Sequence, residues 1–195
     1  MNKLTCLWGI VAALLAAPAA ATTLSFAPGP AAVLVGDTFT LDVLVADAPD
    51  LYAFQFDIAY DPAIIQADTV LEGDFLSAGG RATFFLPGTI DNIAGTVSFT
   101  ANTLLGPGPG VTGDGLVVHL TFQALGAGLS DLSFGNVVLL DSALAEIATV
   151  PTSGTINVSS VPEPASYGLL GIGLAVVAIG LRRRMRNRYA SGMVG

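Results

Sequence analysis

Residues 38–60, TFTLDVLVADAPDLYAFQFDIAY, decide the fold of this chain. Apolar side chains occupy every second position from Phe39 to Val45, and again from Tyr52 to Tyr60. This period of two is typical of strands that have one buried face and one polar face. Turn-forming residues separate the two runs at 47–50. The stretch therefore predicts two long antiparallel strands, Thr38–Ala46 and Leu51–Tyr60, over one core.

Other segments of the chain carry the same pattern. Thr96–Thr103 is predicted to turn Val97, Phe99 and Ala101 inward, and Gly115–Leu125 to turn inward the even-numbered residues from 116 to 124. Asp61-Pro62 is expected to end a strand and to begin a turn or helical step over Ala63–Gln66. Weaker strands are expected at Leu24–Ala27, Ala32–Leu34, Thr69–Glu72, Ala82–Leu86, Leu132–Leu140 and Thr155–Val158. Roughly nine or ten strands at this spacing predict an all-β, two-sheet sandwich.

The N-terminus reads as a secretory signal peptide over residues 1–21. Lys3 supplies the positive start, a mostly apolar stretch follows, and Ala19 and Ala21 are the small residues that a signal peptidase requires. The single cysteine, Cys6, would leave with this segment, so we expect an exported domain without disulfides or thiol-bound metal.

The exported part is strongly acidic. All of the acidic residues except Glu163 fall between Thr22 and Val161, where Arg81 is the only lysine or arginine. This charge excludes nucleic acid as a partner and favours solubility or cation binding. Its length predicts one domain, 22–158, that is large enough to bury a core without covalent staples.

The C-terminus has three parts in a fixed order. Residues 159–166 form a linker that contains Val161-Pro162-Glu163-Pro164, and the uncharged residues 167–181 follow. As a helix that rises about 1.5 Å per residue, these fifteen residues cover roughly 22 Å, which predicts a short single transmembrane helix. The last part, residues 182–195, is a basic tail that we expect to stay in the cytoplasm. Its charges are Arg182, Arg183, Arg184, Arg186 and Arg188.

This tail resembles the PEP-CTERM sorting signal of Gram-negative bacteria. Pro162-Glu163-Pro164 matches the name-giving triplet, residues 167–181 match the short span, and the arginines match the basic cluster. The resemblance implies recognition by an exosortase and removal of the tail near the triplet. It also implies a membrane-anchored precursor that is later delivered to the cell surface or the extracellular matrix. Residues 189–195 run beyond the point where such tails usually stop.

The exported domain resembles the cohesin family over about residues 24–158. The resemblance is carried by Gly36-Asp37 before a long strand and by Tyr60-Asp61-Pro62 at the end of a strand pair. Ile64-Ile65, Gly73-Asp74-Phe75-Leu76, Gly95-Thr96-Val97-Ser98-Phe99, Gly113-Asp114-Gly115-Leu116-Val117 and Gly154-Thr155-Ile156-Asn157-Val158 complete it. It implies a jelly-roll β-sandwich of about nine strands that binds a dockerin-like protein or an extracellular polysaccharide. Residues that contact a dockerin are not matched by any motif here.

Catalysis has few candidate residues in this chain. The one histidine, His119, is predicted on a polar strand face with Thr121 and Gln123, and no nucleophile motif accompanies it. We interpret these three residues and Asp57 as a binding face. Paired carboxylates could hydrolyse a glycosidic bond, and Asp42 with Asp57, or Glu72 with Asp74, are the pairs to consider. The more economical interpretation of both pairs is a solvated strand or turn, so no enzyme activity is expected.

A structural calcium ion is the one cofactor for which the sequence offers ligands. Three acidic pairs bracket predicted turns: Asp47 with Asp50, Glu72 with Asp74, and Asp141 with Glu146. None of them has the spacing of a one-segment calcium loop, so no metal-ligating residue is assigned.

The sequence therefore predicts an exported, non-catalytic binding module of the cell surface or matrix. Two alternatives stay open at this point. One is a structural acidic matrix protein without a specific ligand, and the other is a component of polysaccharide degradation.

Overall fold

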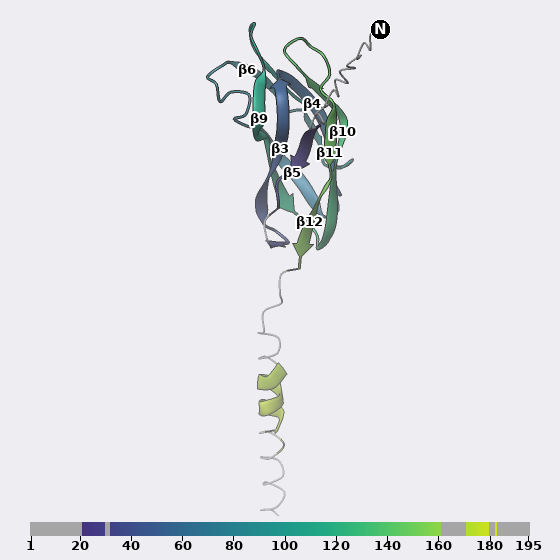
Figure 1. Ribbon diagram of the computed structural model, residues 1–195. Helices are drawn as coiled ribbons and strands as arrows, with labels where there is room; N and C mark the ends of the chain where they lie inside the picture. Colours follow the sequence, from purple (N-terminus) through teal and green to yellow (C-terminus); the bar gives the residue numbers. More distant parts are fainter. Residues whose placement is uncertain (1–20, 30–31, 161–170, 180–181, 183–195) are drawn as a thin grey trace, which may run out of the picture.

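A computed structural model describes residues 21–29, 32–160, 171–179 and 182 (Figure 1). Within these residues the chain is dominated by strands, as the alternating patterns predict. The first six strands are β1 (Thr22–Phe26), β2 (Val33–Leu34), β3 (Thr38–Leu51), β4 (Ala53–Ala59), β5 (Ile65–Glu72) and β6 (Thr83–Leu86). The remaining strands are β7 (Thr89–Asp91), β8 (Thr96–Leu104), β9 (Val111–Ala124), β10 (Gly128–Leu140), β11 (Thr149–Thr152) and β12 (Gly154–Ser159).

The strands form two sheets that pack face to face (Figure 1). One sheet has the order β11-β1-β3-β9-β5, and the other has the order β2-β12-β10-β4-β8-β6 with β7 also paired to β8. Most neighbours are antiparallel, whereas β1 with β11 and β2 with β12 are parallel. This arrangement is the predicted jelly-roll sandwich, with more strands than the nine or ten that the sequence indicated.

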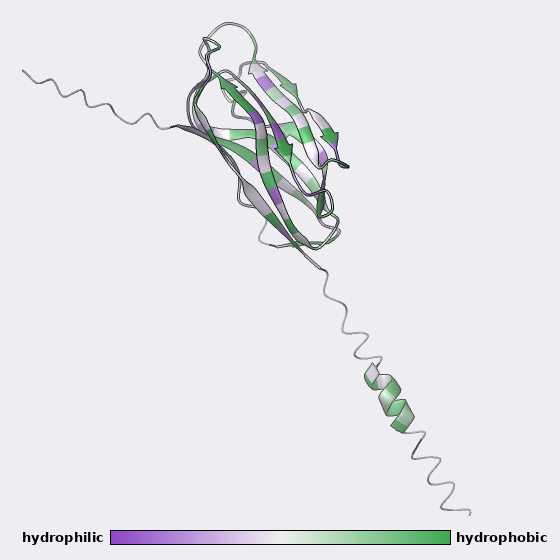
Figure 2. Ribbon diagram, turned by 90° about the vertical axis from the view of Figure 1, so that its right-hand side faces the viewer, coloured by the Kyte–Doolittle hydropathy of each residue, from purple (hydrophilic) through white to green (hydrophobic). Residues whose placement is uncertain are grey.

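The alternation in residues 38–60 is confirmed, whereas the turn expected at 47–50 is wrong, because β3 continues through these residues to Leu51. Figure 2 shows hydrophobic and polar positions alternating along the strands. β3 and β4 lie in opposite sheets, and their apolar sets meet in the core between them. The buried residues of these two runs are Phe39, Leu41, Val43, Val45, Phe54, Phe56, Ile58 and Tyr60.

The predicted inward face of β8 is wrong beyond Val97. The structure buries Thr100 and Asn102 and leaves Phe99 about half exposed. The cause is a register shift against β4, located where Phe99 has a positive φ of 60°. A β-bulge of this kind adds one residue to a strand and reverses the faces of all residues after it.

β9 contains a similar irregularity. Val117 and Val118 are both buried, although strict alternation predicted Val117 on the outer face. The pairing with β3 shifts by one residue at this point, where Val43 opposes Val118 and Leu44 opposes Leu116. The even-numbered residues from 118 onward are buried as predicted, whereas Leu116 is only partly buried.

The sequence pattern does not predict two short strands, β7 and β11. The turn after Asp61 is shorter than expected. Residues 62–64 form a turn, and the strand begins at Ile65, inside the segment that was predicted as a turn or helical step. Backbone bonds from Ile64 N–H and Ile65 N–H to the Asp61 carbonyl explain the compact turn.

The C-terminal predictions fall mostly outside the described residues. Residues 171–179 form an exposed helix, and within the described part of the chain no helix is long and apolar enough to cross a membrane. The sorting triplet with Val161, the ends of the proposed 167–181 span, and the arginines after Arg182 lie outside the described residues, as does the predicted signal peptide before Ala21.

Candidate functional site

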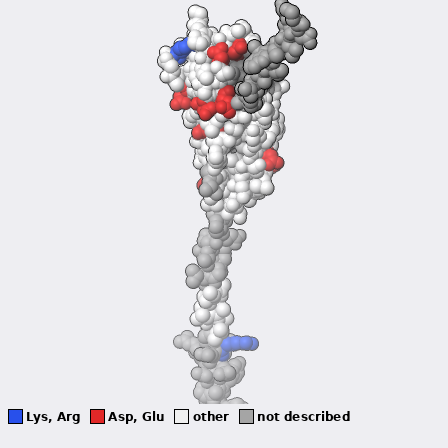
Figure 3. Space-filling view, viewed as in Figure 1, with Lys and Arg blue, Asp and Glu red and all other residues white. Residues whose placement is uncertain are grey.

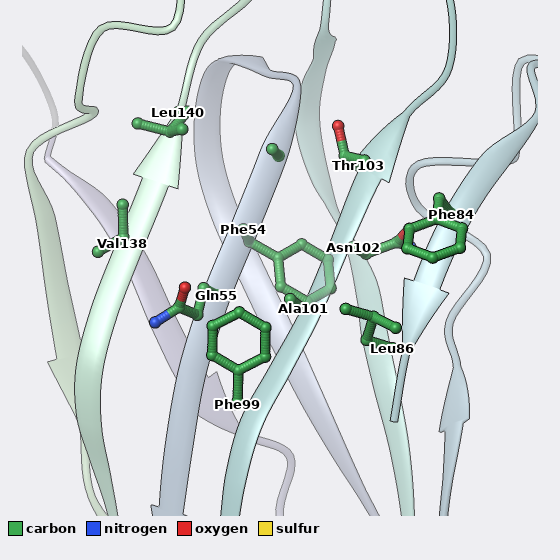
Figure 4. A pocket seen from close by; sticks show the side chains of 11 residues that line it. Phe54, Gln55, Phe84, Leu86, Phe99, Ala101, Asn102, Thr103, Val138 and Leu140 are labelled. Atoms are coloured by element: carbon green, nitrogen blue, oxygen red, sulfur yellow. The ribbon is translucent and has the colours of Figure 1, made fainter. Parts of the chain in front are cut away.

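The outer face of the β10-β4-β8-β6 sheet is apolar and hollowed. A groove of about 210 Å³ crosses it, and its walls come from all four strands (Figure 4). The lining residues are Ala53, Phe54, Gln55, Phe84, Leu86, Phe99, Ala101, Asn102, Thr103, Val138 and Leu140. No lysine, arginine or carboxylate is among them.

Four large apolar side chains of the groove reach solvent. Phe84 is 55% exposed, Phe99 52%, Leu86 37% and Val138 36%. Figure 4 shows the Phe99 ring between Gln55 and Leu86, with Phe84 and Val138 on opposite sides of the groove. Large contiguous apolar surfaces on folded domains are often binding sites, so this groove is the candidate site of the domain.

The sequence pattern did not reveal this groove, because the strict alternation of β8 assigned Phe99 and Ala101 to the core. One signal was available. The consecutive aromatics Phe84-Phe85 in β6 guarantee that one of the two rings faces outward, since neighbours in a strand point to opposite faces. Phe84 is that ring, whereas Phe85 packs against the core.

The structure does not bring the four predicted binding residues onto one surface. His119, Thr121 and Gln123 lie on β9, which belongs to the five-stranded sheet, whereas Asp57 lies on β4 in the other sheet. The grouping of Asp57 with the three β9 residues is therefore a prediction that the topology corrects.

The β9 residues are engaged with neighbouring strands. His119 Nδ1 lies 2.6 Å from Asp42 Oδ1 on β3, and Gln66 Nε2 on β5 donates to Gln123 Oε1 at 2.8 Å. Thr121 lies opposite Thr40 in the β3–β9 register. These contacts are cross-strand pairs of a solvated sheet face.

Neither carboxylate pair that was considered for glycoside hydrolysis flanks a common cleft. Asp42 and Asp57 were expected on adjacent strands, but they lie on β3 and β4, which belong to different sheets. Glu72 Oε1 accepts hydrogen bonds from Thr83 and Asn102, whereas Asp74 is exposed in the following turn. The geometry of the described residues thus gives no support to these pairs as a general acid and its partner.

Two of the acidic residues considered for calcium, Asp47 and Asp50, lie within β3 and not in a turn, and the Asp50 carboxylate is bound by distant segments of the chain. Asp50 accepts hydrogen bonds from Gly110 N–H and from the Ser142 hydroxyl and N–H, and the Ser142 bonds hold the pKa of Asp50 below its ordinary value. The Asp47 N–H donates to Asp114 Oδ1 at 2.8 Å. Among the described residues, no three histidine, cysteine or acidic side chains gather around one point. Acidic groups do concentrate on one part of the domain surface (Figure 3).

Comparisons with known proteins match these features. The cohesin domain family matches residues 26–158, and the PEP-CTERM protein-sorting motif matches residues 160–184. No curated protein matches the chain.

Solved structures with the same fold cover most of the chain. The second type II cohesin module of an adaptor scaffoldin from Acetivibrio cellulolyticus is 16% identical, with a TM-score of 0.61 over 76% of this chain and 96% of that chain. A non-cellulosomal cohesin from the archaeon Archaeoglobus fulgidus is 16% identical, with a TM-score of 0.56 over 76% of this chain and 98% of its own. A type I cohesin–dockerin complex from Clostridium thermocellum contains a chain that is 16% identical, with a TM-score of 0.58 over 72% of this chain and 95% of that chain. At these identities the likeness establishes the fold.

Proposed function

The chain belongs to the cohesin domain family, and we propose that it is an exported, exosortase-sorted surface protein that binds another protein without catalysis. The observation that carries this proposal is the apolar groove on the outer face of the β10-β4-β8-β6 sheet. The occupant is a folded protein module that inserts aliphatic or aromatic side chains into the groove, because its walls offer mainly carbon atoms and few hydrogen-bonding groups.

A dockerin-like module is the partner class that we favour. The Clostridium thermocellum relative was solved as a complex with a dockerin. A polysaccharide is the less favoured ligand, since sugar hydroxyls need polar partners and Gln55, Asn102 and Thr103 are the polar residues of the groove. The surrounding domain is acidic, which also disfavours anionic glycans.

The sorting motif sets the proposed destination. A precursor would be exported by its signal peptide, held in the membrane by residues 167–181 and then processed by an exosortase near Pro162-Glu163-Pro164. The mature domain would be delivered to the cell surface or the extracellular matrix of a Gram-negative bacterium. In this account the acidic surface keeps the released domain soluble, and calcium bridging between acidic domains is the route by which a purely structural matrix role would act.

Photo-crosslinking in the native bacterium tests the docking face. The photoreactive amino acid benzoylphenylalanine would replace Val138 in the groove or, as a matched control, Thr40 on the outer face of the other sheet. We expect one dominant protein adduct from position 138 and none from position 40, and Phe99→Ala should abolish that adduct. Equal adduct patterns from both positions, or none from position 138, would contradict the proposal.

A further inference from the structure

Asp57 lies between two β-bulges on neighbouring strands. On one side, the pairing of β4 with β8 shifts between Phe56 and Ile58. On the other side, the pairing of β4 with β10 shifts between Gly135 and Val138. Asp57 is therefore the β4 residue on which both irregularities converge.

The Asp57 carboxylate binds one residue of each bulge. The Phe99 N–H of β8 donates to Oδ1 at 2.7 Å, and the Asn136 side-chain amide of β10 donates to Oδ2. Each carboxylate oxygen thus has its own donor from a different strand, and hydrogen bonds to an ionised acceptor are the stronger kind.

Both of these donors belong to residues with left-handed backbone. Phe99 has a φ of 60° and Asn136 a φ of 47°. Asparagine adopts this conformation fairly readily, whereas it is a rare choice for an aromatic residue. Such strain persists where the surroundings over-determine it, and it is concentrated at functional sites.

We propose that Asp57 is a positioning residue that clamps both bulges and thereby holds the Phe99 ring in the docking groove. This inference rests on the proposed function, because it assigns Asp57 a role in forming the surface on which the partner binds. The bulge turns Phe99 and Ala101 outward, where they line the groove. Without the clamp, the left-handed conformation at Phe99 loses its support, and the Phe99 ring leaves its position between Gln55 and Leu86.

A reciprocal exchange of the two polar side chains tests the clamp. Asp57→Ala removes both acceptors, and Asn136→Asp places two carboxylates together. Both single variants should shift the Phe99 amide signal in the nuclear magnetic resonance spectrum of the ¹⁵N-phenylalanine-labelled full chain in detergent, whose ten phenylalanines keep the spectrum simple. Combining Asp57→Asn with Asn136→Asp should restore it, since an amide at 57 can accept from Phe99 N–H and donate to the carboxylate at 136. Asp131→Ala, which removes an exposed β10 carboxylate bonded to Thr155, is the control and should leave this signal in place.

The consequence for docking is measured separately, through the benzoylphenylalanine probe at position 138. Asp57→Ala, which loses both hydrogen bonds to the carboxylate, should lower the adduct yield at least about tenfold, and the exchanged pair should recover it. An unmoved Phe99 amide in Asp57→Ala overturns the clamp. If Asp57→Ala moves the Phe99 amide signal but leaves the adduct yield unchanged, while Phe99→Ala lowers that yield, the role of Asp57 in docking is overturned. If the chain with the probe at position 138 and no other substitution gives no adduct, the proposed function fails. The amide shifts and their rescue then show by themselves whether Asp57 holds the two bulges.

Discussion

Replacing Glu72 by alanine should destabilise the domain by breaking a bridge between the two sheets. Glu72 ends β5 at the edge of the five-stranded sheet, and its Oε1 accepts from Asn102 Nδ2 of β8 at 2.9 Å and from Thr83 Oγ1 of β6 at 2.5 Å. Asn102 is only 3% exposed, and its Oδ1 has no hydrogen-bond partner in the described structure. Glu72→Ala therefore leaves the whole Asn102 amide buried without a partner.

The magnitude follows from what Asn102 loses. A buried donor left without its acceptor costs about 1–3 kcal/mol, whereas Thr83 can turn its hydroxyl to water at little cost. We expect a loss of about 2–3 kcal/mol in the free energy of unfolding. For a domain of this size, that corresponds to a fall in Tm of roughly 6–12 °C.

Urea unfolding followed by far-ultraviolet circular dichroism measures this loss. Asn102→Leu removes the buried amide, so combining it with Glu72→Ala should recover part of the loss and give a coupling energy of about 1–2 kcal/mol. Asp74→Ala removes an exposed carboxylate two residues further on and should change stability by less than about 0.5 kcal/mol. The reasoning is refuted if Glu72→Ala costs no more than this control, or if the two substitutions are additive.

Three further predictions concern a turn, an acidic residue at the end of β3 and the tail. Gly95→Ala should cost more than about 2 kcal/mol, because φ there is +70° and a Cβ would lie 2.3 Å from a backbone oxygen; Gly36→Ala, with φ +96° and open space around it, should cost about 1 kcal/mol in the same urea assay. Hydrogen bonds from Ser142 are the main cause that lowers the pKa of Asp50 in the folded protein, so the unfolded protein binds more protons at this residue. The stabilisation from ionised Asp50 should therefore be present above the ordinary pKa of the carboxyl group, and it should be lost as the pH falls through the folded pKa. When the free energy of unfolding is measured against pH, its fall below pH ~4 should be less steep for Asp50→Asn than for the unmodified protein. An unchanged slope would argue against the hydrogen bonds from Ser142 to Asp50. Alanines at 162–164 should leave an unprocessed, membrane-held precursor on immunoblots of fractionated cells, and normal processing would show that the triplet is not the signal.

The sequence pattern was sufficient to predict the fold class. Burial of one face of a strand requires apolar residues at every second position, and this period of two is visible in the sequence without knowledge of any tertiary contact. Phe54, Phe56 and Ile58 could be assigned to the core for this reason. The same logic failed at Phe99 and Val117, since a bulge adds one residue to a strand and leaves no mark in the polarity of the residues themselves. A strand pattern also does not say which sheet a strand joins, which is why Asp57 and His119 were placed on one face.

The order of a polar break, an apolar stretch and an arginine cluster at the C-terminus is a linear signal that can be read from the sequence without a structure. The sorting motif at the C-terminus and the likeness to cohesins could therefore be inferred from the amino acids alone, and the family comparisons match both, whereas the signal peptide stays a prediction. The docking groove could not, because its walls come from strands that are distant in the chain and its central ring faces solvent only through a left-handed backbone at Phe99. That conformation depends on a carboxylate 42 residues away in the chain, and only the folded arrangement of β4, β8 and β10 brings the two together.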